Sequence, residues 1–245
     1  MFKHYTLKHK LSTILTMLFY IIFLLMVIYA AFNSKGDYRS ILFVIIGIVA
    51  LIFGTLNEYI KYLYNESLWY LNFKIDTKKA CETYDKLTKY DIFGMYKKNR
   101  GLFDTMVAIE EKDGKRALKV IEDNIKKYNS NVELLLIRCY YEMRANLLLG
   151  RDKRVNEIYN DVRNIEKMKK RPKIFQYDEL DGLAELARKN KGLAYDHFVK
   201  VNMKNMNPKE MKFVLENLIL TSPENMRGQY QEDLSRLLEA VDESL

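Results

Sequence analysis

The sequence predicts an all-α protein in which a two-helix transmembrane hairpin precedes a helical domain. Residues 11–34 contain no charged side chain, and neither do residues 40–57 after a short polar turn. Only three prolines and ten glycines occur in 245 residues, which favours long helices with short connections. A repeating pattern after residue 60 further indicates that the helices of this domain come in similar pairs.

The two apolar runs, residues 11–32 and 41–60, are each long enough to cross a bilayer, because about twenty helical residues span a hydrocarbon core of roughly 30 Å. Inside lipid the backbone must satisfy its own hydrogen bonds, so both runs should be helices. The alternative for the first run is a cleaved signal peptide, since lysines precede it. The run is too long for such a peptide, and a second run follows at once. We therefore expect a membrane hairpin over residues 1–60.

The basic residues that flank the two runs predict its orientation. Three lysines precede the first run and six follow the second, whereas the turn at residues 33–40 carries only Lys35 and Arg39. Basic flanks stay in the cytoplasm, so both termini should face the cytoplasm of a cell membrane that the chain crosses twice. Gly47 and Gly54 allow close packing on one helix face. The hairpin is thus an anchor or a surface that binds another membrane protein.

Composition limits the partners of the remaining 185 residues. Five of the 40 basic and two of the 32 acidic residues precede residue 61, which leaves a net charge of +5 beyond it. This charge suits a body close to an anionic lipid leaflet, but it is too dilute to indicate nucleic-acid binding. Cys81 and Cys139 have no further cysteine or histidine at metal-ligand spacing, and we expect buried free thiols.

A repeat with spacings of 37, 38 and 39 residues runs through the domain. Each unit opens with Asp or Asn, a good helix N-cap, followed by basic residues, a small or β-branched residue and, four positions later, a large one. These positions share one helix face with a third apolar position, at which Asn124 is an exception. The small and large residues are, in order, Ala80 and Tyr84, Ala117 and Ile121, Val155 and Tyr159, and Ala194 and Phe198. A further amphipathic stretch precedes each of these helices.

This pattern resembles tetratricopeptide repeats, whose second helix carries Ala and then Phe or Tyr four residues later. Ala80 with Tyr84 and Ala194 with Phe198 match best. The units here are longer than the 34 residues of that family, and the usual small residue of the first helix and the terminal proline are missing from most of them. The resemblance implies a tetratricopeptide-like α-solenoid of about four units over residues 61–205. A non-repeating helical bundle is the alternative.

The last segment, residues 206–245, should add two capping helices. Pro208 and Pro223 suit first helical turns, after Asn207 and Ser222 as possible caps. Among the tyrosines, we expect most to pack between helices and some to line a concave groove. The tyrosines in question are Tyr140, Tyr141, Tyr159, Tyr177 and Tyr195.

No motif for catalysis or for nucleotide or metal binding occurs in the sequence. His197 is expected on the surface, without a nucleophile nearby in sequence. The carboxylates of Asp178, Glu179 and Asp181 are expected on a solvated helix face. The sequence therefore predicts a protein that is not an enzyme, with no cofactor and no small-molecule substrate.

A basic cluster stands out between the third and fourth helix pairs: Lys167, Lys169, Lys170, Arg171 and Lys173. It is either a solvated connection or a contact for an acidic partner or lipid headgroups. Together these features predict a membrane-anchored adaptor of bacterial type, whose cytoplasmic repeats bind a protein or peptide. The alternative is an accessory or regulatory subunit of a membrane complex that binds through its hairpin.

Overall fold

The computed structural model describes residues 2–33, 38–168 and 175–243, and these residues contain helices but no strand. Their contacts divide the chain into two compact units. One holds the residues up to 69 together with 78–95, and the other holds residues 70–77 with 96–243. The all-α prediction is confirmed, with two long apolar helices preceding a packed helical domain.

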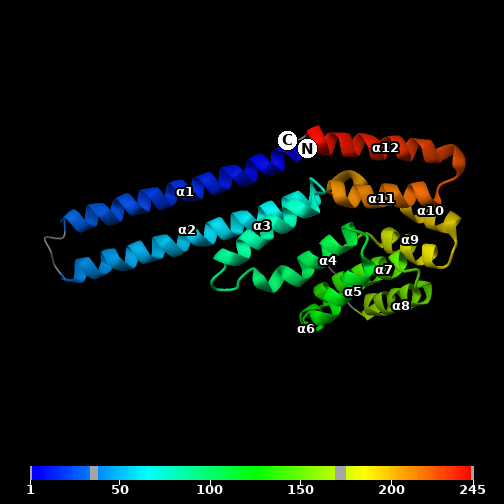
Figure 1. Cartoon of the computed structure of the whole chain (residues 1–245), viewed down its shortest axis with the longest axis horizontal. Coiled ribbons are helices and arrows are strands. Elements are labelled where there is room, and N and C mark those ends of the chain that lie inside the picture. The colour runs from blue at the N-terminus through cyan, green and yellow to red at the C-terminus, as the bar shows by residue number, and fades with distance from the viewer. Residues whose placement is uncertain (1, 34–37, 169–174, 244–245) are drawn as a thin grey trace. The chain divides into compact units, whose positions relative to one another are not determined.

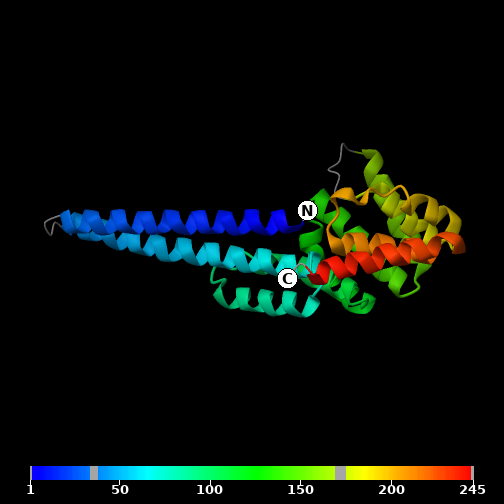
Figure 2. The same cartoon turned by 90° about the horizontal axis from the view of Figure 1, so that it is seen from above.

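The first unit contains α1 (Phe2–Asn33), most of α2 (Tyr38–Asn72) and α3 (Thr77–Tyr90). In Figures 1 and 2, α1 and α2 run side by side in opposite directions. Both are long and apolar enough to cross a membrane, and most of their apolar side chains point outward. α2 continues to Asn72, well beyond the expected end of the second span.

The two glycines of the second apolar run lie where α2 meets α1. A Cβ atom on Gly47 would come within 3.0 Å of Val27, and one on Gly54 within 2.9 Å of the Tyr20 ring. Val27 is accordingly one of the few buried residues of α1, with 3% of its surface exposed. The glycine-bearing face of α2 is thus covered by α1.

The second unit follows in chain order as a series of helix pairs, drawn from green to red in Figure 1. α4 packs on α5, α7 on α8, α9 on α10 and α11 on α12. A short helix, α6 (Ile125–Tyr128), lies between the first two pairs. The pairs are α4 (Arg100–Glu110) with α5 (Gly114–Asp123), α7 (Val132–Leu148) with α8 (Asp152–Met168), α9 (Tyr177–Ala187) with α10 (Lys191–Phe198), and α11 (Pro208–Thr221) with α12 (Glu224–Glu243).

One residue with a positive φ ends the first helix of every repeat unit. These residues have φ between 55° and 66°, in the left-handed region, and each stands five positions before the small residue of its unit. They recur with the same spacings of 37, 38 and 39: Ile75, Lys112, Gly150 and Lys189. The turn and the packing pattern therefore repeat together.

The hydrogen bonds of three of these turns follow the Schellman motif. At the first of them, the Lys112 N–H donates to the Ile109 carbonyl over 3.1 Å, and the Asp113 N–H donates to the Ala108 carbonyl over 2.9 Å. The turns at Gly150 and Lys189 repeat the same two bonds. The Asp113 side chain then caps the next helix by accepting from the Arg116 N–H, as expected for this aspartate. Asn190 does not cap its helix, because its amide donates to Glu185 instead.

The small and large repeat residues form the core between paired helices. Ala80, Tyr84, Ala194 and Phe198 have no exposed surface. The Phe198 ring lies against Gly182 of α9, where a Cβ atom would approach it to 2.8 Å, so a small residue is required there.

The expected repeat pattern fails at one position of the third unit. Ile158 takes the buried place, with 2% of its surface exposed, whereas Tyr159 is only partly buried. The hydroxyl of Tyr159 donates to Asp181 over 2.8 Å, so its ring turns toward the next helix pair. A polar partner therefore sets the direction of this side chain.

The left-handed turns allow a stability test with two glycines. Replacing Gly150 with alanine places a Cβ atom at a positive φ and should lower the free energy of unfolding by about 1 kcal/mol. Gly228 lies within α12 and faces open space, so Gly228→Ala should raise the free energy of unfolding by about 0.5–1 kcal/mol. Urea unfolding of the full chain in detergent, followed by circular dichroism, measures both. A Gly150→Ala protein as stable as the natural chain would contradict the assigned turn.

Candidate binding groove

The first helices of the pairs in the second unit line two neighbouring cavities, and we call the two cavities together the groove. On α7, Ile137, Tyr141, Arg144 and Leu148 follow one another at spacings of three or four residues, and Tyr140 stands one turn from both Ile137 and Arg144. α4, α9 and α11 contribute faces in the same way. The groove contains two cavities, of about 640 Å³ and about 660 Å³, and we call them the apolar cavity and the aromatic cavity.

The apolar cavity has leucine, isoleucine and phenylalanine side chains over most of its surface. Leu148 and Leu220 remain 44% and 53% exposed at its edge. Its other apolar residues are Ile109, Leu147, Leu183, Leu186, Phe213, Ile219 and Leu234. Three ion pairs border it and join different helix pairs: Lys112 with Glu216, Lys189 with Asp152, and Lys212 with Glu110.

The aromatic cavity combines four aromatic rings with three carboxylates. Tyr140 and Phe175 are stacked, with centroids 5.6 Å apart, while Tyr141 and Tyr177 meet them edge to face. The carboxylates belong to Asp178, Glu179 and Glu210. None of the described residues that line this cavity is a lysine, arginine or histidine.

A buried polar cluster forms the wall between the two cavities. The Tyr140 hydroxyl donates to Glu179 Oε1 and accepts a bond of 3.2 Å from Arg144 Nη1. The Arg144 guanidinium lies 3.5 Å from the centre of the Phe213 ring. Burial raises the pKa of both Tyr140 and Glu179. The cluster thus joins α7, α9 and α11 at the middle of the groove.

One buried atom of this cluster has no hydrogen-bond partner among the described residues. Arg144 Nε is buried and donates to no acceptor. A buried N–H without an acceptor is costly, because water no longer solvates it. Glu179 is only 4% exposed, and its Oε1 accepts from Tyr140.

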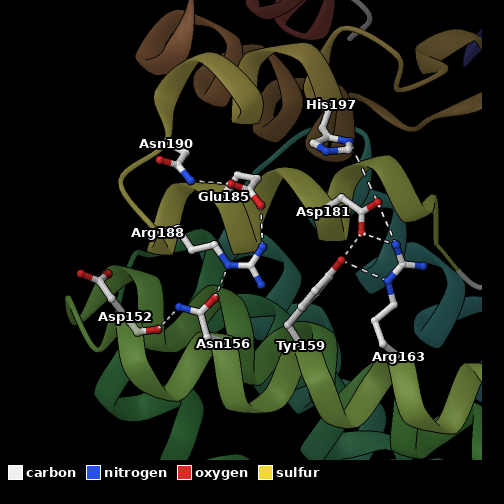
Figure 3. Close-up of polar contacts among 9 residues, drawn as sticks. All are labelled: Asp152, Asn156, Tyr159, Arg163, Asp181, Glu185, Arg188, Asn190 and His197. Atoms are coloured by element: carbon white, nitrogen blue, oxygen red, sulfur yellow. Dashed lines mark hydrogen bonds and ion pairs between the residues drawn. The ribbon is translucent and has the colours of Figure 1, made fainter.

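A second polar network, drawn in Figure 3, ties α8 to α9. Arg163 Nε donates to the Tyr159 hydroxyl over 3.0 Å, and Arg163 also bonds Asp181. Arg188 donates to Asn156 on α8 over 3.1 Å and to Glu185 over 2.5 Å. These contacts fix α9 against α8 and so position the groove residues of α9.

His197 lies beside this network. It is partly exposed, and its Nδ1 stands 3.6 Å from Asp178 and 4.0 Å from Asp181, beyond hydrogen-bond distance. The expectation of a surface histidine therefore holds only for part of its ring, because Nδ1 itself is buried.

The solvated helix face expected for the α9 carboxylates is wrong for Glu179 and Asp181. Both are largely buried, because α9 packs against α7 and α8. The carboxylate of Glu179 accepts from the Tyr140 hydroxyl, and that of Asp181 accepts from the Tyr159 hydroxyl. A signal in the sequence was the placement of Tyr140 and Arg144 four residues apart on an otherwise apolar helix face. Such a polar pair needs a partner from the facing helix.

The remaining candidate residues lie elsewhere. The basic cluster of Lys167, Lys169, Lys170, Arg171 and Lys173 lies outside the described side chains. Cys139 is buried, and burial raises the pKa of its thiol to about 11, which keeps it protonated at neutral pH. Cys81 is partly exposed.

Comparison with known proteins gives no relative. No family model, curated protein or solved structure matches this chain. The groove must therefore be interpreted from its own geometry and chemistry.

Lys209 gives the groove region a pH-dependent stability. It is 6% exposed in the first turn of α11, and burial, followed by the charge of Arg144, lowers its pKa to about 8. The unfolded chain keeps the proton up to a pH of about 10.5, whereas the folded chain releases it near 8. Stability should therefore rise with pH between these two values.

Replacing Lys209 with methionine removes the buried charge while it keeps the length of the side chain. At pH 7 we expect the free energy of unfolding to increase by roughly 1–3 kcal/mol, and we expect this gain to fade above a pH of about 10.5. Urea unfolding of the full chain at several pH values tests it. Lys204→Met, at an exposed position, is the control and should show no such trend. A loss of stability in Lys209→Met at pH 7 would contradict this account.

Proposed function

We propose that this protein is a membrane-anchored, non-enzymatic adaptor whose groove binds a segment of a partner protein. The observation that carries the proposal is the groove itself, lined by one face of each first helix from α4 to α11. Tetratricopeptide-like solenoids, which the repeat pattern resembles, present an extended surface of this kind.

The surface of the groove supports a protein segment as its ligand. Partly exposed leucines beside well-formed ion pairs resemble the anatomy of protein interfaces, in which an apolar centre has a polar rim. Two neighbouring cavities of similar size suit side chains that project from one helix or one extended strand. A helix or strand that follows the groove would fill both.

The hairpin supplies the anchor in this proposal. Helices α1 and α2 are long and apolar enough to span a membrane, and the basic flanks favour cytoplasmic termini. Anchoring confines the groove to the membrane surface and so raises its effective concentration for partners there. Because α1 covers the glycine face of α2, that face is less suited to binding a second membrane protein.

A photocrosslinking amino acid placed in the groove tests the proposal. At Leu148 or Leu220 it should capture a partner in native membranes, because these side chains are exposed at the edge of the apolar cavity. Leu193 of α10 is 52% exposed but lies outside the groove, and it serves as the control. Identical adducts from all three sites, or none from the groove, would contradict the proposal.

A chimera separates the adaptor from a subunit that binds through its hairpin. Residues 1–56 are replaced with an unrelated two-span hairpin, and the crosslinking at Leu148 is repeated. The adaptor should retain its partner. Loss of the partner from a chimera that still reaches the membrane would favour the hairpin as the interface.

Labelling of single cysteines tests the proposed orientation. In a chain with Cys81 and Cys139 replaced by serine, Asn33→Cys should react with a membrane-impermeant maleimide in intact cells, because the turn between α1 and α2 faces outward. Ser130→Cys, at an exposed position of the second unit, should react only after lysis. The opposite pattern would reverse the topology.

A further inference from the structure

We infer that the aromatic cavity binds an arginine side chain of the partner segment. This inference rests on the proposed function, and it assigns a chemistry to one part of the groove. The cavity offers carboxylates for the charge and aromatic rings for the flat face of a guanidinium.

The charges of the lining favour a cation. Asp178, Glu179 and Glu210 bring three carboxylates to one cavity, and no basic residue among the described ones lines it. Arg144 and Lys209 do not belong to this lining, and Arg144 is stacked on Phe213 on the side of the apolar cavity. An apolar side chain in the aromatic cavity would remove water from the carboxylates without replacing its hydrogen bonds.

Glu179 offers a carboxylate to a ligand in the aromatic cavity, because it is one of the residues that line it. Its Oε1 accepts from Tyr140, which fixes the carboxylate in the cavity wall, and Oε2 takes no part in that bond. A ligand with N–H donors could form further hydrogen bonds with this carboxylate. A guanidinium has five such donors in one plane.

The rings favour arginine among the basic side chains. Tyr140 and Phe175 form a stacked pair, and their neighbours Tyr141 and Tyr177 meet them edge to face. A guanidinium is less strongly hydrated than an ammonium group and lies flat on such rings. Arg144 already makes this contact on the Phe213 ring, 3.5 Å from its centre.

Methyl NMR of the full chain in nanodiscs tests the inference with a defined probe. Met106 and Met206 line the aromatic cavity, whereas Met143 is a fully buried residue of the core and serves as the internal control. N-acetyl-arginine amide should shift the labelled methyl signals of Met106 and Met206 in a saturable way and leave Met143 unchanged. N-acetyl-citrulline amide, which has a similar shape but no charge, should bind about tenfold more weakly or worse.

Two variants show whether the carboxylates carry the binding. Glu179→Gln keeps an acceptor for the Tyr140 hydroxyl but removes the negative charge. Asp178→Asn removes the negative charge of a carboxylate at the rim of the cavity. Each should weaken the arginine probe about tenfold. Glu122→Gln removes an exposed carboxylate of α5 that lines neither cavity and should leave binding unchanged. Equal binding of citrulline, or full binding by both variants, would overturn the inference.

The outcome is separable from that of the proposed function. If the arginine probe shifts Met106 and Met206 but no partner is crosslinked at Leu148 or Leu220, the arginine site is supported and the adaptor function is contradicted. If a partner is crosslinked but the cavity does not prefer arginine over citrulline, the adaptor function is supported and the arginine site is contradicted.

Discussion

Reversal of the chain at a single left-handed residue is the constraint on which the helical domain depends. At Lys112, Gly150 and Lys189 the first helix closes with a Schellman pair of hydrogen bonds, and the next helix begins at once. This short connection forces the two helices to pack closely, which explains the small residue five positions later. Two of these turns use lysine where glycine would be relaxed, so tertiary packing must offset a backbone cost of about 1 kcal/mol at each.

Much of this fold was predictable, because apolar periodicity and N-cap residues are local signals. The spacing of the small residues located the paired helices, and Asn207 caps α11 before Pro208 as expected. The direction of the Tyr159 side chain was not predictable. This direction depends on Asp181 and Arg163, which are brought together only when α8 and α9 pack. The sequence indicated both halves of α2, as the second apolar run and as the amphipathic stretch before the first repeat helix, but it did not show that they join into one helix that ends at Asn72.

The sequence led us to expect a concave surface, but it did not reveal the chemistry of the two cavities. The residues that create it, Tyr140, Arg144 and Glu179, come from two helices that are far apart in the sequence, so only the fold shows that they meet. Their burial is expensive, since an arginine and a carboxylate leave water for a tyrosine hydroxyl and an aromatic ring. A protein selected for stability alone would be served better by apolar residues at these positions. Buried polar residues that do not favour stability are typical of binding surfaces.

The length of α2 has a mechanical consequence. Its 35 residues span about 50 Å, whereas a hydrocarbon core takes up only about 30 Å. If α2 crosses a membrane as proposed, the remainder would form an arm outside the bilayer, and α3 packs on this arm through ring contacts such as Tyr64 with Tyr84. With no proline in α2 to bend it, a small change in helix tilt within the bilayer would become a displacement of several ångströms at α3. The hairpin would then transmit movement as well as hold position.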